Sequence, residues 1–275
     1  MQERSILITG CSSGIGLCCA HGLKARGWRV FATARQPADV KRLAAEGLES
    51  LPLDLSDPAS LNAAVDEILS RSVGRLDALF NNGAYGQPGA VEDLTREALR
   101  EQFETNVLGW HELTRRALSV MRGQGHGRIV FNSSVLGFVA LRYRGAYNAS
   151  KYAIEGLADT LRLELRGSGI HVSLIEPGPI ESRFRANALL AYRRNIDAEH
   201  SVHRAAYEHM EQRLAKEGPA VSFTLPPEAV LKKLVHAIES SRPRPRYYVT
   251  FPTYLFGTLK RVLSTRLLDR LLYRV

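Results

Sequence analysis

The fold is decided by residues 5–16, which form the stretch Ser5-Ile6-Leu7-Ile8-Thr9-Gly10-Cys11-Ser12-Ser13-Gly14-Ile15-Gly16. The apolar run before Gly10 has the length of a strand, and apolar residues recur at helical spacing from Ile15 to Arg26. Glycines between the two let the backbone turn sharply and approach an anion, and the first amides of a helix attract negative charge. The stretch therefore predicts a strand, a phosphate-binding turn and a helix, as at the start of a dinucleotide-binding unit.

Strand-like and helix-like segments alternate along the rest of the chain. Asp57 and Pro58 are a helix cap and a first-turn proline, and they open the second helical pattern. Strands joined by helices of this length form a parallel sheet covered on both faces. We therefore expect an α/β fold, a single Rossmann-type doubly wound parallel sheet with helices on both faces. The expected strands are 28–33, 48–53, 76–80, 127–132 and 170–175, and the expected helices are 57–70, 99–121 and 147–166.

Four conspicuous positions directly follow expected strands: Gly10, Asn82, Ser134 and Pro177. In open parallel sheets, ligands bind beyond the carboxyl ends of the strands. The four positions therefore predict one ligand site at that edge of the sheet.

Tyr147 and Lys151 are four residues apart, so on a helix their side chains lie on one face, one turn apart. A free phenol titrates near pH 10, and a neighbouring cation lowers that pKa and makes the phenol usable as an acid or base. Ser134 can donate a hydrogen bond to the same reacting oxygen. The three residues predict proton transfer to or from a carbonyl or alcohol oxygen, although such a pair alone is common on ordinary helices.

Arg35 ends the second expected strand, where a site that prefers NAD usually has an acid for the ribose hydroxyls. An arginine there can bind a 2′-phosphate instead, which favours NADP, unless Arg35 is one of many solvated arginines. Asp54 follows the third expected strand and either accepts a hydrogen bond from an adenine amino group or caps its loop.

Composition excludes several other classes of protein. The 275 residues are 45% hydrophobic and 24% charged, as in an ordinary soluble domain. The cysteines Cys11, Cys18 and Cys19 lack metal or disulfide spacing, which predicts no metal site and a reducing, cytoplasmic location. We find neither a signal peptide nor a spanning segment. The net charge is +9, but much of the excess is in the C-terminal tail and no nucleic-acid motif accompanies it, so no nucleic-acid partner is expected.

Together these motifs resemble the classical short-chain dehydrogenase/reductase family over about residues 4–182. The matching segments are TGCSSGIG at 9–16, NNGA at 81–84, SSVLG at 133–137, YNASK at 147–151 and PGPI at 177–180. TGCSSGIG, FATAR at 31–35 and SLIEPGPI at 173–180 are closest to bacterial NADP-dependent aldehyde reductases, which are similar to 17β-hydroxysteroid and retinol dehydrogenases.

The resemblance implies reduction of a lipophilic aldehyde or ketone to an alcohol by hydride transfer from NADP(H). Tyr147 would be the general acid, Ser134 would donate to the same oxygen, and both would contact substrate. Lys151 would hold the nicotinamide ribose and lower the phenol pKa, and Asn106 would hold a water linked to Lys151. The implied cofactor contacts are Gly10, Ser12, Ser13, Gly14, Ile15, Gly16, Arg35, Asp54, Leu55, Asn82, Gly83, Tyr147, Lys151, Pro177, Gly178 and Ile180.

Two segments depart from the family pattern. Gly83 and Ala84 exchange the usual order of alanine and glycine, so the second position of that turn must accept a Cβ. Glu181-Ser182 replaces the threonine commonly found after the PG motif, which puts the nicotinamide amide contact there in question.

The chain divides into an NADP-binding domain at 1–250 and a tail at 251–275. Residues 181–218 are expected to cover the substrate pocket as a lid with helical pieces, or else to be a solvated excursion. The tail is expected to form one amphipathic basic helix, with leucines at helical spacing beside Lys260, Arg261 and Arg270. It would pack on its own core, join a homodimer or homotetramer interface, or lie on the inner face of a membrane.

Two other functions stay open at this point. The same site can oxidise a hydroxysteroid or retinol-like alcohol with NADP, or the chain can be a non-catalytic NADPH-binding regulator. A pure binder has no need of Ser134, which argues against the regulator.

Overall fold

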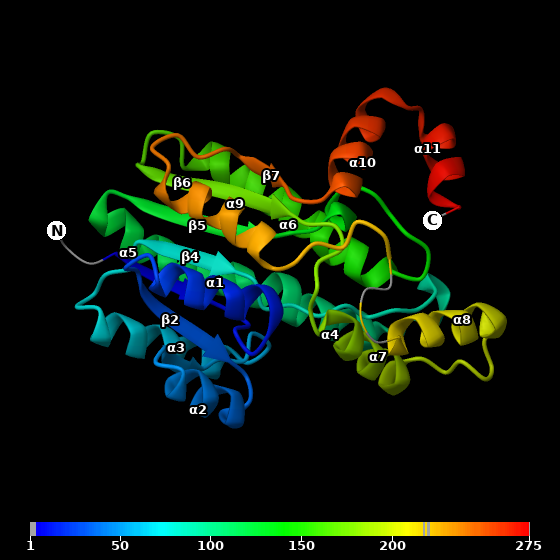
Figure 1. Ribbon diagram of the computed structural model, residues 1–275, viewed down its shortest axis with the longest axis horizontal. Helices are drawn as coiled ribbons and strands as arrows, with labels where there is room; N and C mark the ends of the chain where they lie inside the picture. Colours follow the sequence, from blue (N-terminus) through cyan, green and yellow to red (C-terminus); the bar gives the residue numbers. More distant parts are fainter. Residues whose placement is uncertain (1–3, 217, 219–220, 275) are drawn as a thin grey trace.

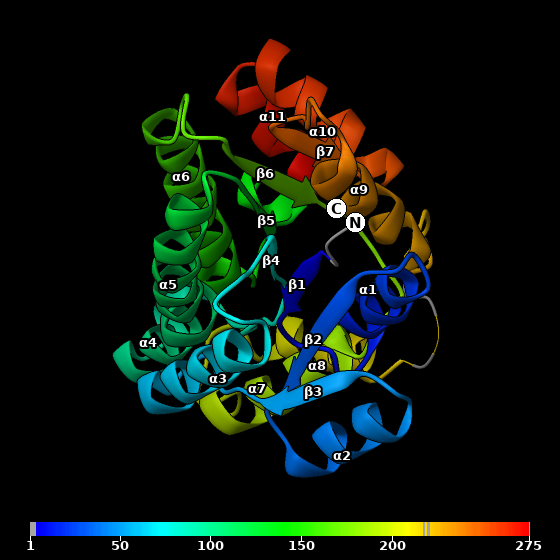
Figure 2. The same ribbon diagram turned by 90° about the vertical axis from the view of Figure 1, so that its left-hand side faces the viewer.

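The computed structural model describes residues 4–216, 218 and 221–274 (Figure 1). Within them, one parallel sheet has the strand order β3-β2-β1-β4-β5-β6-β7, and helices cover both of its faces (Figure 2). The predicted fold class is confirmed, and β7 is a strand that the sequence patterns did not indicate. The strands are β1 (Ser5–Ile8), β2 (Arg29–Ala34), β3 (Glu49–Pro52), β4 (Ala78–Asn81), β5 (Gly127–Asn132), β6 (Ile170–Glu176) and β7 (Arg246–Tyr248).

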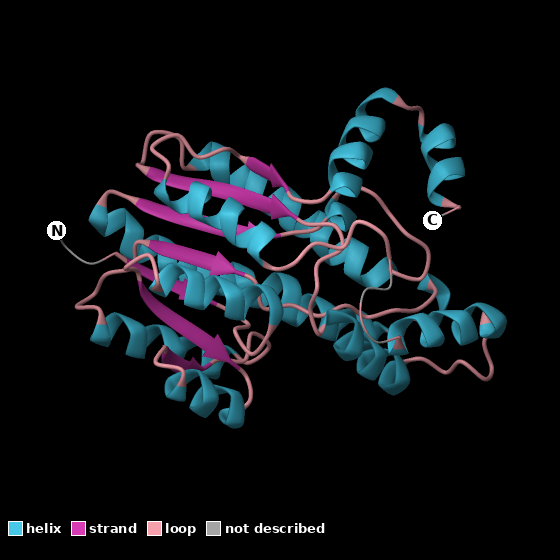
Figure 3. Ribbon diagram, viewed as in Figure 1, coloured by secondary structure: helices cyan, strands magenta, loops and turns pink. Residues whose placement is uncertain are grey.

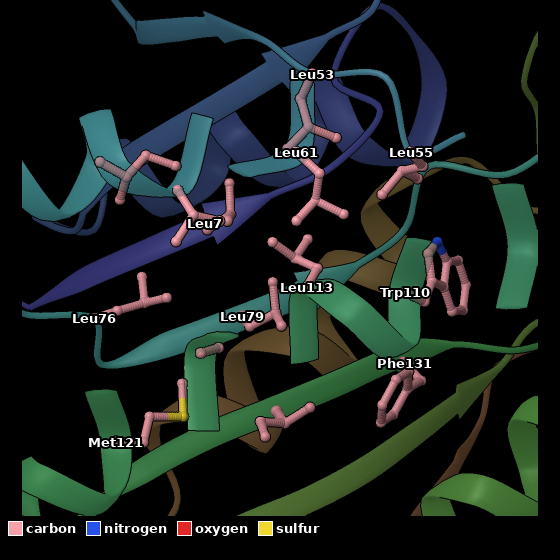
Figure 4. Packing of buried hydrophobic residues seen from close by; sticks show 14 of the residues in the cluster. Leu7, Leu53, Leu55, Leu61, Leu76, Leu79, Trp110, Leu113, Met121 and Phe131 are labelled. Atoms are coloured by element: carbon pink, nitrogen blue, oxygen red, sulfur yellow. The ribbon is translucent and has the colours of Figure 1, made fainter. Parts of the chain in front are cut away.

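Two apolar layers hold the helices on the sheet. One layer packs α3, α5 and α6 against one face, around the fully buried Trp110 and Leu79 (Figure 4). The other packs α1 and α9 against the opposite face, around Ile8 and Phe80. The helices are α1 (Gly14–Lys24), α2 (Pro37–Ala45), α3 (Pro58–Arg71), α4 (Arg96–Phe103), α5 (Gly109–Gln124), α6 (Gly145–Glu164), α7 (Phe184–Asn195), α8 (Arg204–Ala215), α9 (Glu228–Glu239), α10 (Phe251–Val262) and α11 (Thr265–Leu272).

The expected helix at 99–121 is not one regular helix. A π-helical segment, Glu104–Leu108, separates α4 from α5 and contains Asn106. α5 begins at Gly109, where a side chain would collide with the backbone oxygen of Leu55. Glycine thus lets α5 approach the loop after β3, and the π segment contains the buried Asn106, in keeping with the frequent occurrence of such segments at functional sites.

The region 181–218, of which residue 217 lies outside the described residues, contains the helices α7 and α8. They form a third apolar cluster around Tyr192, Tyr207 and Met210. The Tyr207 hydroxyl donates to Asp93 and accepts from the Ala90 amide at 2.9 Å, which ties α8 to the loop after β4. The region is therefore packed helical structure and not a merely solvated excursion.

The tail at 251–275, of which residue 275 lies outside the described residues, is two helices and not the single helix predicted. Leu263 and Ser264 have extended dihedral angles (ψ 145° and 154°), so the helix cannot continue through them. The two helices form an arch at one end of the molecule (Figure 3). No helix among the described residues has the length and apolar character needed to cross a membrane.

Candidate active site

The glycine turn after β1 is built by close backbone contacts. Gly10 has a φ of 71°, and a Cβ on it would lie 2.5 Å from the Cα of Gly83. A Cβ on Gly16 would collide with the Gly10 oxygen, and one on Gly14 would lie 2.9 Å from the Ser182 Cβ. The turn therefore has room for backbone only, which is the cradle that a pyrophosphate needs.

Asn82 joins the ends of three strands. Its side-chain amide donates to the Thr9 oxygen at 2.8 Å, and its side-chain oxygen accepts from Asn132 at 2.8 Å. The Thr9 hydroxyl accepts from the amides of Asn82 and Gly83 at 2.9 and 2.8 Å. The exchanged order of Gly83 and Ala84 is compatible with this arrangement, since the glycine lies at the close approach to Gly10.

The residues predicted for the adenosine end are near the turn but do not line the main cavity. Arg35 is exposed at the end of β2. One Asp54 carboxylate oxygen accepts from the Ser56 amide at 3.0 Å and from its hydroxyl at 2.7 Å, so Asp54 caps its own loop. Leu55 is buried beside Gly83. None of these three side chains lines the main cavity.

Ser134, Tyr147 and Lys151 converge on one cavity, as the sequence predicted. Tyr147 and Lys151 project from α6, and Ser134 follows β5. The Lys151 ammonium donates to the Asn132 oxygen at 2.8 Å and lies 4.2 Å from the Trp110 ring centroid and 5.5 Å from that of Tyr147. The Ser134 oxygen accepts from the Leu136 amide at 3.1 Å, and its hydroxyl hydrogen-bonds with the Tyr147 phenol.

Burial controls the acidity of this group. It lowers the pKa of Lys151 to about 7, against the opposing effect of Glu155. It raises the pKa of Tyr147 above its usual range, although a hydrogen bond with Ser134 acts in the other direction. Burial thus outweighs the Ser134 hydrogen bond at the phenol, and the effect of Lys151 on the phenol pKa stays a prediction.

Asn106 is completely buried beneath the cavity and does not line it. Its side-chain oxygen accepts from the Tyr85 amide at 3.2 Å, and its amide donates to the Tyr85 oxygen at 2.9 Å and to the Ser150 hydroxyl at 3.2 Å. The side chain is thus committed to the loop after β4 and to α6, and it contacts Ser150, whose hydroxyl donates to the Tyr147 backbone oxygen at 2.8 Å.

The cavity extends from the glycine turn to the helices α7 and α8 and has a volume of about 710 Å³. Phe184 of α7 closes one side and meets the Tyr147 ring edge-on at 5.2 Å between centroids. The base of the covering region is pinned by a hydrogen bond from the Glu181 amide to the Leu225 oxygen at 3.0 Å. Predicted cofactor contacts that line this cavity are Gly10, Ser12, Ser13, Ile15, Asn82, Gly83, Tyr147, Lys151, Pro177, Gly178 and Ile180, whereas Gly14 and Gly16 shape the turn behind it.

Comparison with known proteins is consistent with this geometry. The model of the short chain dehydrogenase family matches residues 4–192. The chain belongs to the short-chain dehydrogenase family. Members are oxidoreductases that act on CH–OH or C=O groups with a nicotinamide cofactor, so this enzyme class is assigned to the chain.

Individual relatives agree over nearly the whole length of this short-chain dehydrogenase. The uncharacterized oxidoreductase YbbO of Escherichia coli K12 is 42% identical over 272 residues, which are 99% of this chain and 95% of YbbO. The NADPH-dependent 3-dehydrocapnine reductase of Ornithobacterium rhinotracheale is 30% identical, covering 98% and 96% of the two chains. A short-chain dehydrogenase/reductase from Burkholderia phymatum, solved in complex with NAD, has a TM-score of 0.77 and 26% identity, covering 95% and 92% of the two chains.

The sequence patterns missed a group of charges behind Lys151 in this short-chain dehydrogenase. Arg246 of β7 pairs with Glu155 of α6, with Glu176 at 2.6 Å and with Asp159 at 2.6 Å. We call these four residues the Arg246 cluster. Glu155 also accepts from Ser133, the neighbour of Ser134. The one available signal was Glu155, which follows Lys151 by one helical turn.

Proposed function

We propose that the chain is an NADP(H)-dependent reductase of lipophilic aldehydes and ketones. The observation that supports it best is the convergence of Ser134, Tyr147 and Lys151 on the cavity whose far end is the glycine turn. The turn fits a dinucleotide because its glycines allow backbone contacts too close for any Cβ, which places the backbone amides before α1 where they can approach a pyrophosphate.

The cofactor would lie along the carboxyl edge of the sheet, with its phosphates against the turn from Gly10 to Gly16. Arg35 is exposed there, and the first helix offers its unpaired amides. No carboxylate follows β2 directly, which supports NADP over NAD. The NADPH dependence of the 3-dehydrocapnine reductase points the same way. When bound, NADPH supplies a hydride.

The chain's own residues would manage the proton. Tyr147 gives its hydroxyl proton to the oxygen of the carbonyl group. Ser134 donates to the same oxygen, since its hydroxyl keeps one donor proton while its oxygen accepts from the Leu136 amide. Lys151 has a pKa near neutrality, so it can hold or release a proton next to Tyr147 at physiological pH. Asn106 positions this arrangement from below through Tyr85 and Ser150.

The covering region, α7 and α8, would act as the substrate lid of the 1–250 domain. Several apolar side chains line the cavity near Tyr147, which suits a substrate with a lipophilic segment. Leu141, Leu136 and Val135 come from the loop after β5, and Phe184 and Leu214 come from the lid.

Turnover distinguishes the three candidate functions. Purified protein is mixed with NADPH and a panel of aliphatic aldehydes, retinal and ketosteroids, and the loss of NADPH is followed. A reductase consumes NADPH with the aldehydes, while a dehydrogenase working in the other direction reduces NADP with retinol or hydroxysteroids. NADPH binding without turnover on either panel would instead support a regulator.

The tail would place this enzyme at an anionic membrane surface, on the inner, cytoplasmic side. α10 is attached to the body through Lys260, whose ammonium donates to the Phe138 oxygen. α11 has no buried residue, and Leu267 and Leu271 are 47% and 41% exposed. The tail carries Lys260, Arg261, Arg266, Arg270 and Arg274 against Asp269, so two copies would repel each other while anionic lipid would attract them.

Flotation with vesicles tests the membrane proposal. We expect binding to vesicles that contain phosphatidylglycerol, and loss of binding when Leu267 and Leu271 are both replaced by serine. Two results together would instead assign the tail to a subunit interface. The protein would not bind anionic vesicles, and light scattering would show a dimer or tetramer that the same replacement dissociates.

A further inference from the structure

Arg144 is a cation in the cavity wall without a carboxylate partner. It directly precedes α6 and lies one helical turn before Tyr147. Among the described residues, the only polar contact of its side chain is from a guanidinium nitrogen to the Met210 sulfur at 3.8 Å. Glu181 is the one acidic residue that lines the cavity within the described part of the chain, and it forms no ion pair with Arg144.

Other arginines show how this chain normally treats such a group. Arg246 is neutralised by three carboxylates, and Arg185 of the lid donates to the backbone oxygens of Arg213, Lys216 and Gly218. Arg144 has neither kind of partner. Burying an uncompensated cation costs free energy, which an anionic ligand would recover.

The backbone is strained to aim Arg144 at the cavity. The preceding residue, Tyr143, has a φ of 60°, which a bulky side chain rarely adopts. Its carbonyl oxygen accepts from the Gly89 amide at 3.1 Å. Its ring packs edge-on against His203 and Tyr207, at 5.5 and 5.9 Å between centroids. The lid and the loop after β4 thus hold a conformation that the chain would otherwise avoid, as at many functional sites.

The position of Arg144 points to substrate and not to cofactor. Arg144 lies at the N-cap of α6, three residues before Tyr147, while Lys151 follows Tyr147 by four residues, about 6 Å along the helix axis. Lys151 reaches back to Asn132 at the end of β5, and Arg144 reaches out to Met210 of the lid. The two cations therefore lie on opposite sides of the phenol, with Arg144 on the side away from the glycine turn.

Arg213 adds a second cation on the same side. It lies on α8 one turn after Met210 and lines the same cavity from the lid. Burial, and to a lesser extent Arg213, lower the pKa of Arg144 to about 10, so Arg144 still carries its charge at neutral pH. Arg183 and Arg185 line the same cavity, and so many like charges around one space are unfavourable unless an anion occupies it.

We propose that Arg144 and Arg213 form a subsite for an anionic group of the substrate. The substrate would then be an amphiphile with an aldehyde or ketone, an apolar segment and a carboxylate-like acidic group. A guanidinium suits such a group because it can donate two parallel hydrogen bonds. This inference rests on the proposed reductase function and refines its substrate class.

The test compares ω-oxo acids of short, medium and long chain with their methyl esters, with saturating NADPH. We expect the wild type to favour at least one acid over its ester in kcat/KM by roughly tenfold to hundredfold, as for a hydrogen-bonded charge pair. Arg144→Gln should reduce that ratio to about one, and Arg144→Lys should restore part of it. Arg142→Gln is the matched control, because this neighbouring arginine stacks on Tyr273 instead of lining the cavity, and it should keep the wild-type ratio.

A wild-type ratio near one at every chain length would overturn the subsite. The subsite would also be overturned if Arg144→Gln lowered kcat/KM equally for the acid and its ester, since equal losses indicate a merely structural arginine. If that variant fails to fold, Arg213→Gln on the exposed rim replaces it. It should lower the ratio several-fold, and an unchanged ratio would contradict the proposal.

Calorimetric binding separates this inference from the reductase function. An unreactive alkyl carboxylate should bind the wild type more tightly than its methyl ester, and Arg144→Gln should abolish the difference. Tighter binding of the carboxylate without any turnover would refute the reductase function and support the subsite. Turnover without any preference for the acid, in binding or in kcat/KM, would support the reductase function and refute the subsite.

Discussion

Replacing Arg246 with glutamine removes the cation from a group of carboxylates behind the candidate active site. Glu176 is fully buried, and the Glu155 side chain is only 9% exposed. Without Arg246, both carboxyl groups stay buried with no neutralising partner. Removing one partner of a buried ion pair costs about 3–5 kcal/mol of unfolding free energy.

The cost should depend on pH in a defined direction. Burial raises the pKa of Glu155, and it raises that of Glu176 from 4.5 to about 8. A raised carboxyl pKa stabilises the folded state at pH values below 4.5, and this contribution is lost as the pH rises through about 8. Loss of Arg246 raises both pKa values further. We therefore expect a destabilisation of about 3–5 kcal/mol at alkaline pH and of only about 1–2 kcal/mol in mild acid, where the carboxyl groups become protonated.

Urea unfolding of Arg246→Gln and wild type in mildly acidic and mildly alkaline buffers measures the effect. Thermal melts give the same comparison, at about 2–4 °C for each kcal/mol. Arg162→Gln is the matched control, because its pair with Asp159 is 35% and 39% exposed and contributes at most about 1 kcal/mol. The same free-energy loss at both pH values, or a loss no larger than that of the control, would refute the reasoning.

Three further substitutions test other parts of the account. Gly16→Ala should weaken NADPH binding at least about tenfold, because its Cβ collides with the Gly10 oxygen; calorimetric affinity equal to wild type would contradict the cradle. Arg35→Asp should shift the ratio of kcat/KM for NADPH over NADH by at least about tenfold toward NADH, and an unshifted ratio would remove Arg35 from the cofactor site. Lys151→Met should gain more unfolding free energy relative to wild type at pH 6 than at pH 9. In wild type, the lowered Lys151 pKa of about 7 destabilises the folded state fully below pH 7, and this cost falls as the pH rises toward 10.5. A relative stability that is independent of pH in urea unfolding would show that Lys151 is not desolvated.

Local sequence signals were sufficient for strands β1 to β6 and for the site at their carboxyl edge. Gly10, Asn82, Ser134 and Pro177 come just after β1, β4, β5 and β6, and these strand ends meet once the strands are parallel. The spacing of Tyr147 and Lys151 needed only the helical period. For the same reason, the Asp57 cap of α3 was found correctly, with its carboxylate accepting from the Ala59 amide.

Features that depend on distant contacts were not predictable in this way. The π segment around Asn106 reflects the packing of α5 on the loop at Leu55. The raised pKa of Tyr147 reflects how deeply the lid and the loops bury the phenol, which no pattern of residues reports. β7 is three residues long and pairs with β6 across an intervening stretch of about seventy residues, so its pairing also lies beyond any local pattern.

Transfer of deuterium from cofactor to product tests the central claim most directly. NADPH deuterated at C4 of its nicotinamide is incubated with a medium-chain aldehyde and the wild-type protein, and the alcohol is examined by mass spectrometry. We predict deuterium in the alcohol with wild type and almost none with Tyr147→Phe, which should still bind NADPH because the glycine turn is untouched. Equal labelling by the two proteins would contradict the role of Tyr147, and unlabelled alcohol from wild type would contradict hydride transfer itself.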